Sequence, residues 1–196
     1  MAAVCEARTA NDQGVSLVEL IVVVVVSSLL AGLLATIFVN GLTTQQKSSA
    51  RDTATGQANV VTATMAEALR NSTSIRVSGA GTRLDAVVTK PSVSFSGTWE
   101  WECRAWAFVD ESVRFSAGST PRPLDASGWT VLVGKSAQRP LDKVAAPSGV
   151  TPFTLVGAKG VNIALDITIG DEQKTVKLSN GMTAQAVATT GAIACW

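Results

Sequence analysis

The chain has 196 residues, which is enough for one domain and an anchoring segment. Its 16 basic and 15 acidic residues give a formal net charge of +1, so the composition does not indicate a nucleic-acid-binding surface. Histidine is absent from the sequence, which excludes Ser-His-Asp and Cys-His catalysis and the common zinc-binding spacings. The sequence contains no phosphate-binding loop, and we expect no catalytic residue, no metal site and no cofactor.

Residues 1–14 lack the apolar core that a secretory signal peptide requires. The apolar stretch of the chain follows these residues instead of lying among them. Their charged side chains are one basic residue, Arg8, and two acidic residues, Glu6 and Asp12. We therefore do not expect an ordinary secretory signal peptide.

Residues 15–42 predict a transmembrane helix. From Leu20 to Val39 about 20 residues, each rising about 1.5 Å in a helix, span roughly the 30 Å of a bilayer's hydrocarbon core. The polar side chains in this stretch are hydroxyls, which can bond helix carbonyls. The valines at 22–26 would favour a strand in water, but an unpaired strand leaves its backbone unsatisfied in lipid, so a helix is expected.

One carboxylate, that of Glu19, lies at the start of the apolar stretch, and the next charged residue is Lys47. An ionised group within a membrane-spanning segment costs on the order of a few kcal/mol and usually has a functional partner. From position alone, Glu19 is either solvated at the level of the lipid headgroups or paired with a cation.

The residues around Glu19 resemble the type IV prepilin signature. In that signature a glycine precedes the future N-terminal residue, a short stretch with Ser or Thr follows, and glutamate is the fifth residue of the mature chain. Gly14, Val15, Ser16 and Glu19 occupy these places, although phenylalanine is usual where Val15 stands. The resemblance covers the leader and the first part of the apolar stretch.

This resemblance implies a type IV pilin-like or pseudopilin subunit with residues 1–14 as its leader peptide. A prepilin peptidase would cleave after Gly14 on the cytoplasmic side and methylate the new amine of Val15. A free α-amine is largely protonated at neutral pH, so it could pair with Glu19 where the dielectric constant is low. The amine could belong to a neighbouring subunit or to the same chain, four residues back along the helix, and both arrangements stay open.

Within the apolar stretch, Ser28, Gly32 and Thr36 recur every four residues. Small side chains at this spacing let transmembrane helices approach closely. We expect this stripe to pack against neighbouring helices. The alternative is a chance spacing in an alanine-rich helix.

Residues 43–72 predict an amphipathic continuation of the helix. Small and apolar residues follow three- and four-residue steps, with polar residues between them. We expect the helix to end near Arg70 and to lay this apolar stripe on a sheet. The stripe consists of Ala50, Ala54, Ala58, Val61, Met65 and Leu69.

Residues 73–196 predict a β-rich globular domain, which the resemblance implies is exported. The fold class is then α+β, with a long N-terminal helix packed on an antiparallel β-sheet domain, as in pilins. Trp101 and Cys103 alternate with Arg104 and Trp106 on opposite faces of one long strand, and we expect the tryptophans to pack in the sheet. Strands are expected at residues 75–77, 84–88, 93–95, 99–109, 113–115 and 129–133, with surface loops at 116–128 and 134–150.

The C-terminal region predicts a β-meander. Alternation over Val161–Ile169 is followed by a turn at 170–173 and a returning strand at 175–178. Asn180-Gly181 then predicts a type I′ turn into a strand over 182–187, because this dipeptide favours the positive φ angles that such turns require.

The three cysteines are distributed between the leader and the β-rich domain. Cys5 lies in the leader, so its removal would leave Cys103 and Cys195. An even number of cysteines in an exported chain favours one disulfide over the alternative of two buried free thiols.

Two functions stay open. The first is a structural subunit of a type IV pilus or pseudopilus, crossing the bacterial cell membrane once, with its N-terminus cytoplasmic and its C-terminal domain outside in a filament. The aromatic strand, long loops and late meander resemble the larger minor pseudopilins (J type, or PilW-like). Its partners would be other pilin or pseudopilin subunits, the prepilin peptidase, an inner-membrane assembly platform and the membrane. The alternative is a non-polymerising single-pass protein with a ligand-binding β-domain.

Overall fold

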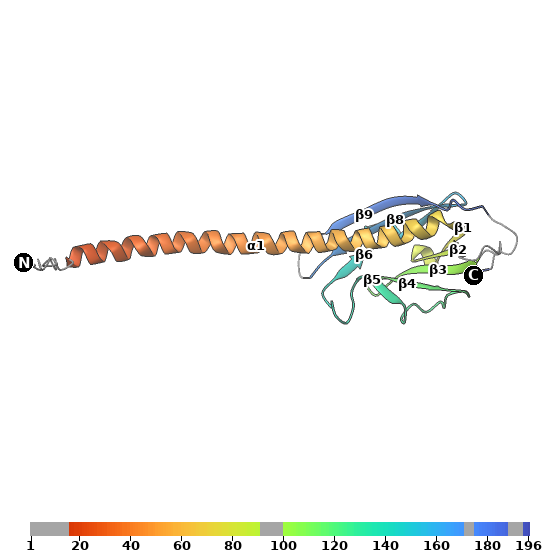
Figure 1. Ribbon diagram of the computed structural model, residues 1–196, viewed down its shortest axis with the longest axis horizontal. Helices are drawn as coiled ribbons and strands as arrows, with labels where there is room; N and C mark the ends of the chain where they lie inside the picture. Colours follow the sequence, from red (N-terminus) through yellow and green to blue (C-terminus); the bar gives the residue numbers. More distant parts are fainter. Residues whose placement is uncertain (1–15, 91–99, 171–174, 188–193) are drawn as a thin grey trace, which may run out of the picture. The chain divides into compact units, whose positions relative to one another are not determined.

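The computed structural model describes residues 16–90, 100–170, 175–187 and 194–196. Its Cα positions divide into two compact units, Met1–Gln46 and Lys47–Trp196. One long helix, α1, spans Leu17–Arg70 and therefore contributes to both units (Figure 1). The predicted helix and its end at Arg70 are confirmed.

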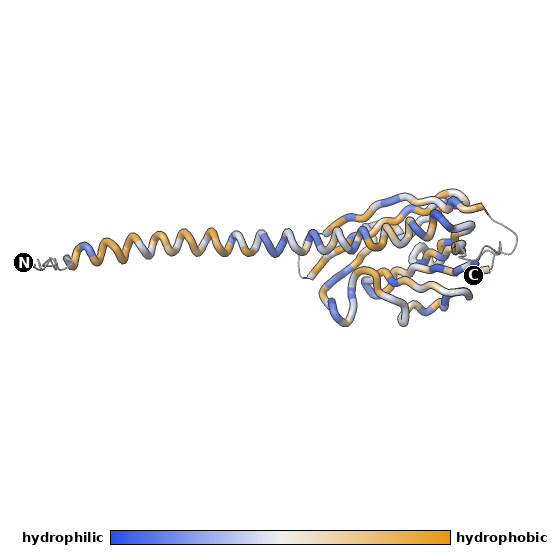
Figure 2. The backbone as a smooth tube through the Cα atoms, viewed as in Figure 1, coloured by the Kyte–Doolittle hydropathy of each residue, from blue (hydrophilic) through white to orange (hydrophobic). Residues whose placement is uncertain are grey.

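In the first unit, α1 is apolar on all sides. The large apolar side chains from Leu17 to Leu42 are between 44% and 74% exposed, so none of them is buried within the chain. Figure 2 shows this apolar part of α1 giving way to a part of mixed polarity. The side chains from Leu17 to Leu42 must therefore find their apolar surroundings outside this polypeptide.

In the second unit, α1 has one buried face. Ala54, Ala58, Val61, Met65 and Leu69 are buried, as the three- and four-residue steps predicted, and Ala50 is half-buried. Their partners are apolar side chains from two antiparallel sheets, which share one core with the helix. The α+β class is thereby confirmed.

The first sheet has five strands in the order β1-β2-β3-β4-β5. Its strands are antiparallel neighbours in sequence, and a short 3₁₀ helix, η1, at Gly79–Gly81 joins the first two. Asp110 and Glu111, both with positive φ, form the tight turn of the predicted β3–β4 hairpin. The strands are β1 Ser72–Ser78, β2 Arg83–Lys90, β3 Glu100–Val109, β4 Ser112–Gly118 and β5 Thr130–Gly134.

The second sheet is built around β8, Gly160–Thr168. On one side β8 pairs with β9, Val176–Thr183, along almost its whole length. On the other side it pairs with β7, Phe153–Val156, at one end and β6, Lys143–Ala145, at the other. β6 and β7 were not predicted, and β6 lies in the segment 134–150 that was expected to be a loop. The expected strand at 93–95 lies outside the described residues.

The predicted turn at Asn180-Gly181 is wrong. These two residues lie inside β9, paired with Ile163 and Asn162. Neither has the positive φ that a type I′ turn requires. A turn there would end the β8–β9 ladder early and would remove Met182 from its contact with the core, so the long pairing partner overrides the local preference.

Candidate functional site

The N-terminus of α1 brings Glu19 into the first helical turn. Helical bonding begins at the backbone N–H of Leu20, which donates to the carbonyl of Ser16 at 3.1 Å. A carboxylate in a first turn is favoured by the helix dipole and by the unpaired N–H groups there. The Glu19 side chain is exposed, and no described residue forms an ion pair or hydrogen bond with it. Gly14 and Val15 lie outside the described residues.

The helix surface beyond Glu19 has the length and composition of a membrane span. A contiguous apolar surface of this size is rare on a soluble monomer and marks a membrane or protein contact. The hydroxyls within it do not interrupt its apolar character. Ser28 donates to the carbonyl of Val25 at 2.8 Å, and Thr36 to that of Leu33 at 2.7 Å.

Gly32 lies between these two hydroxyl residues in the same stripe. A Cβ atom placed on Gly32 would have no described atom within 4 Å outside its own helix segment. The stripe of Ser28, Gly32 and Thr36 is therefore exposed, and its packing against neighbouring helices stays a prediction.

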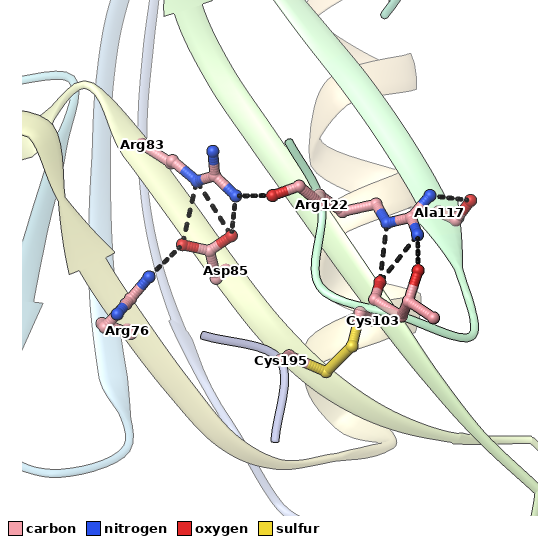
Figure 3. The surroundings of a disulfide bond; sticks show 8 residues. Arg76, Arg83, Asp85, Cys103, Ala117, Arg122 and Cys195 are labelled. Atoms are coloured by element: carbon pink, nitrogen blue, oxygen red, sulfur yellow. Dashed lines mark hydrogen bonds and ion pairs between the residues drawn. A yellow bond between two sulfur atoms is a disulfide. The ribbon is translucent and has the colours of Figure 1, made fainter. Parts of the chain in front are cut away.

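The disulfide between Cys103 and Cys195 is present, as predicted. The two Cα atoms are 5.4 Å apart, and both side chains are buried at 1% and 2% exposure. The bond joins β3 to a segment 92 residues later in the chain (Figure 3). A buried disulfide is typical of proteins that fold in an oxidising compartment outside the cytosol.

We expect the folded protein to be lighter by two hydrogen atoms than its fully reduced form. Intact-mass measurement before and after reduction under denaturing conditions checks this. Blocking free thiols on the native protein should leave Cys103 and Cys195 unlabelled, whereas labelling of both would contradict the bond.

A charged cluster on the outer face of the first sheet was not predicted (Figure 3). Arg83 donates to both carboxylate oxygens of Asp85 at distances of 2.7 to 3.0 Å, and Arg76 approaches the same carboxylate at 3.5 Å. The side chains of Arg83 and Asp85 are only 8% and 2% exposed. An Arg and an Asp two positions apart on a strand share a face, but nothing in the sequence indicates that this face is covered.

The covering element is the segment 119–129, which arginine side chains hold in place. Arg83 donates to the carbonyls of Arg122 and Pro123 at 3.0 and 2.7 Å, and Arg114 donates to that of Ser127 at 2.6 Å. Within the segment, the backbone N–H and the hydroxyl of Ser127 donate to Asp125, and these bonds hold the pKa of that carboxyl below its usual value. The cluster of Arg76, Arg83 and Asp85 therefore stabilises the domain. Its geometry does not indicate a catalytic site.

Comparison with known proteins bears on the N-terminal segment. A family model described as the prokaryotic N-terminal methylation motif matches residues 9–35. The searches of curated proteins and of solved structures found no match to the chain. The matched range contains Gly14, Val15, Glu19 and most of the exposed apolar surface, and together they support membrane anchoring. The motif points to a structural protein and not to an enzyme. Residues 9–35 thus contain the prepilin signature of the type IV pilin-like proteins.

Proposed function

We propose that the chain is a structural subunit of a type IV pilus or pseudopilus that assembles through its N-terminal helix. A prepilin peptidase cleaves after Gly14 and methylates Val15. The observation that carries this proposal is the coincidence, in one segment, of the methylation motif with a helix whose apolar side chains are exposed on every side. A helix of this kind is suited first to a bilayer and then to a bundle of identical helices.

The proposed role of Glu19 follows from electrostatics. Cleavage creates a cationic amine at Val15, close to the N-terminus of α1. In a water-poor bundle an unpaired carboxylate or amine is costly, so each favours a partner of opposite charge. Glu19 pairs with the amine of the neighbouring subunit and so sets the axial register between adjacent helices. Among the described residues Glu19 has no ion-pair or hydrogen-bond partner and is exposed, so its carboxylate is accessible to the amine of a neighbouring subunit.

The globular unit lies outside the cytoplasmic membrane in this proposal, with the N-terminus on the cytoplasmic side. The buried disulfide supports export, because cytosolic thiols are kept reduced. The inner-membrane assembly platform and other pilin or pseudopilin subunits are the expected partners. Filament recovery tests the proposal. The processed chain should appear in filaments sheared from cells that express the complete assembly machinery, and its retention in the membrane fraction alone would contradict it.

Helix packing gives a prediction with an internal control. Gly32→Leu should reduce the amount of chain in sheared filaments several-fold, because a bulky side chain separates helices that meet at the stripe of small residues. Gly41→Leu makes the same change on the opposite side of α1, at a position that is equally open. Immunoblotting of filament and membrane fractions measures both variants, and equal losses for the two would contradict a role for the stripe.

A further inference from the structure

Two open cavities lie between α1 and β9 in the globular unit, and we call the strip of surface that runs between these two elements the groove. One cavity, of about 360 Å³, is lined by Arg51 and Thr55 of α1 and by Val176 and Lys177 at the start of β9. The other, of about 310 Å³, lies between Leu69 and Arg70 of α1 and the residues from Asn180 to Gln185. The two cavities therefore follow the same pair of elements.

One wall of the groove is an open strand edge. β9 pairs with β8 from Val176 to Thr183, and no strand in the described part of the chain pairs with its other edge (Figure 1). Alternate residues of β9 consequently direct their N–H and C=O groups away from the sheet, where they can bind an added strand. Beyond β9 the groove is closed, because the N–H of Gln185 donates to the carbonyl of Leu69 at 3.3 Å.

Between the two cavities, one flank of α1 carries short side chains, none of them longer than asparagine. Thr55, Asn59, Thr62 and Ala66 follow four-, three- and four-residue steps and so lie on one side of the helix. Thr55 and Ala66 line the two cavities, one at each end. Short side chains leave room for a backbone to run alongside the helix.

The charged residues that line the described part of the groove are all positive. Arg51 and Lys177 lie at the open end and Arg70 at the closed end, and no described carboxylate lines either cavity. Within residues 16–90, 100–170, 175–187 and 194–196, none of these three cations has an ion-pair partner. Glu67, three residues before Arg70, pairs instead with Arg104 at 3.4 Å.

We propose that this groove binds an extended acidic peptide of a partner protein as an additional strand on β9. Main-chain hydrogen bonds to β9 supply affinity in this mode of recognition, and the side chains of alternate residues supply specificity. The eight residues of β9 set the length of the bound segment. Arg51, Lys177 and Arg70 select acidic side chains along it. The site lies apart from the apolar surface of α1 between Leu17 and Leu42, through which we propose that the chain assembles.

The test uses the full chain in a non-ionic detergent and a fluorescein-labelled peptide of eight alternating Thr and Glu residues. Fluorescence anisotropy should show saturable binding, and hydrogen exchange of the β9 amides should slow in the complex. Arg51→Glu/Lys177→Glu should weaken binding by about tenfold or more. Lys135→Glu/Lys143→Glu, which reverses two exposed cations elsewhere on the domain, should not.

A matched peptide with N-methyl groups on alternate backbone nitrogens keeps the charge but cannot form the full ladder, so it should not bind. Failure of the acidic peptide to bind would overturn the proposal. Equal binding of the N-methylated peptide would overturn it too, since charge alone would then suffice. Self-association of the chain that protects β9 without peptide, detected by sedimentation velocity, would assign the edge to a second copy instead.

Discussion

Glu19→Ala is expected to reduce incorporation of the chain into filaments by about 100-fold or more, while export and folding are unchanged. Removing one member of a charge pair in a water-poor bundle leaves the other unpaired, at a cost of about 3 kcal/mol or more at each contact. The side chain is exposed in the single chain, so its loss should not affect the folded domain. Quantitative immunoblotting of sheared filaments measures the effect.

Glu100→Ala serves as the control for this experiment. It removes an exposed carboxylate from the start of β3, far along the chain from the N-terminal segment. Both variants should retain the Cys103–Cys195 bond and the same near-ultraviolet circular dichroism. Wild-type levels of the Glu19→Ala chain in filaments would remove the proposed role of this carboxylate.

Asp85→Ala is expected to lower the free energy of unfolding by about 3 to 5 kcal/mol, because it leaves the buried guanidinium of Arg83 without its counter-ion. The loss should extend to segment 119–129, whose carbonyls at Arg122 and Pro123 accept bonds from Arg83. Urea denaturation followed by tryptophan fluorescence measures the change, since Arg83 stacks on Trp129 at 5.1 Å.

Glu67→Ala gives the comparison for a solvent-exposed pair. Glu67 is 67% exposed and lies 3.4 Å from Arg104, so its removal should change stability by no more than about 1 kcal/mol. A similar loss for the two variants would show that burial does not control the strength of the Asp85 pair. A loss below about 1 kcal/mol for Asp85→Ala would contradict its counter-ion role.

The helix was predictable because its signals are strong and local. The apolar stretch before Lys47 is long enough to span a bilayer, and the later steps from Ala54 to Leu69 match the period of a helix packed on one side. Its buried polar residue was not predictable. Gln57 lies on that buried face and donates to Asp142 at 3.2 Å, a contact between residues 85 positions apart that only the folded chain brings together.

The strands were predicted less completely, because their partners are distant in sequence. β7 is short, so its own residues give only a weak strand signal. Its backbone is extended because it pairs with β8. At Asn180-Gly181 the local preference favours a turn, yet the ladder with β8 and the contact of Met182 with the core determine the backbone there. Short-range signals of this kind fail where a long neighbouring strand offers uninterrupted hydrogen bonds.

The N-terminal signature was predictable because it is a short, linear pattern of residues. The spacing from Gly14 to Glu19 needs no tertiary structure, and the match to the methylation motif covers it. The Arg83–Asp85 cluster and the groove beside β9 had no such pattern. Whether these residues are buried or exposed depends on which other segments lie against the sheet. The alternation of residues along a strand does not specify those segments.

The most direct test is to read the mature N-terminus after expression of the full chain with a prepilin peptidase. Edman sequencing or mass spectrometry of the membrane-purified protein should find Val15 as the first residue, carrying one added methyl group, and no peptide from residues 1–14. A chain that begins at Met1 or Ala2 under the same conditions would contradict processing at Gly14, and with it the assembly of this protein through a freed amine and Glu19.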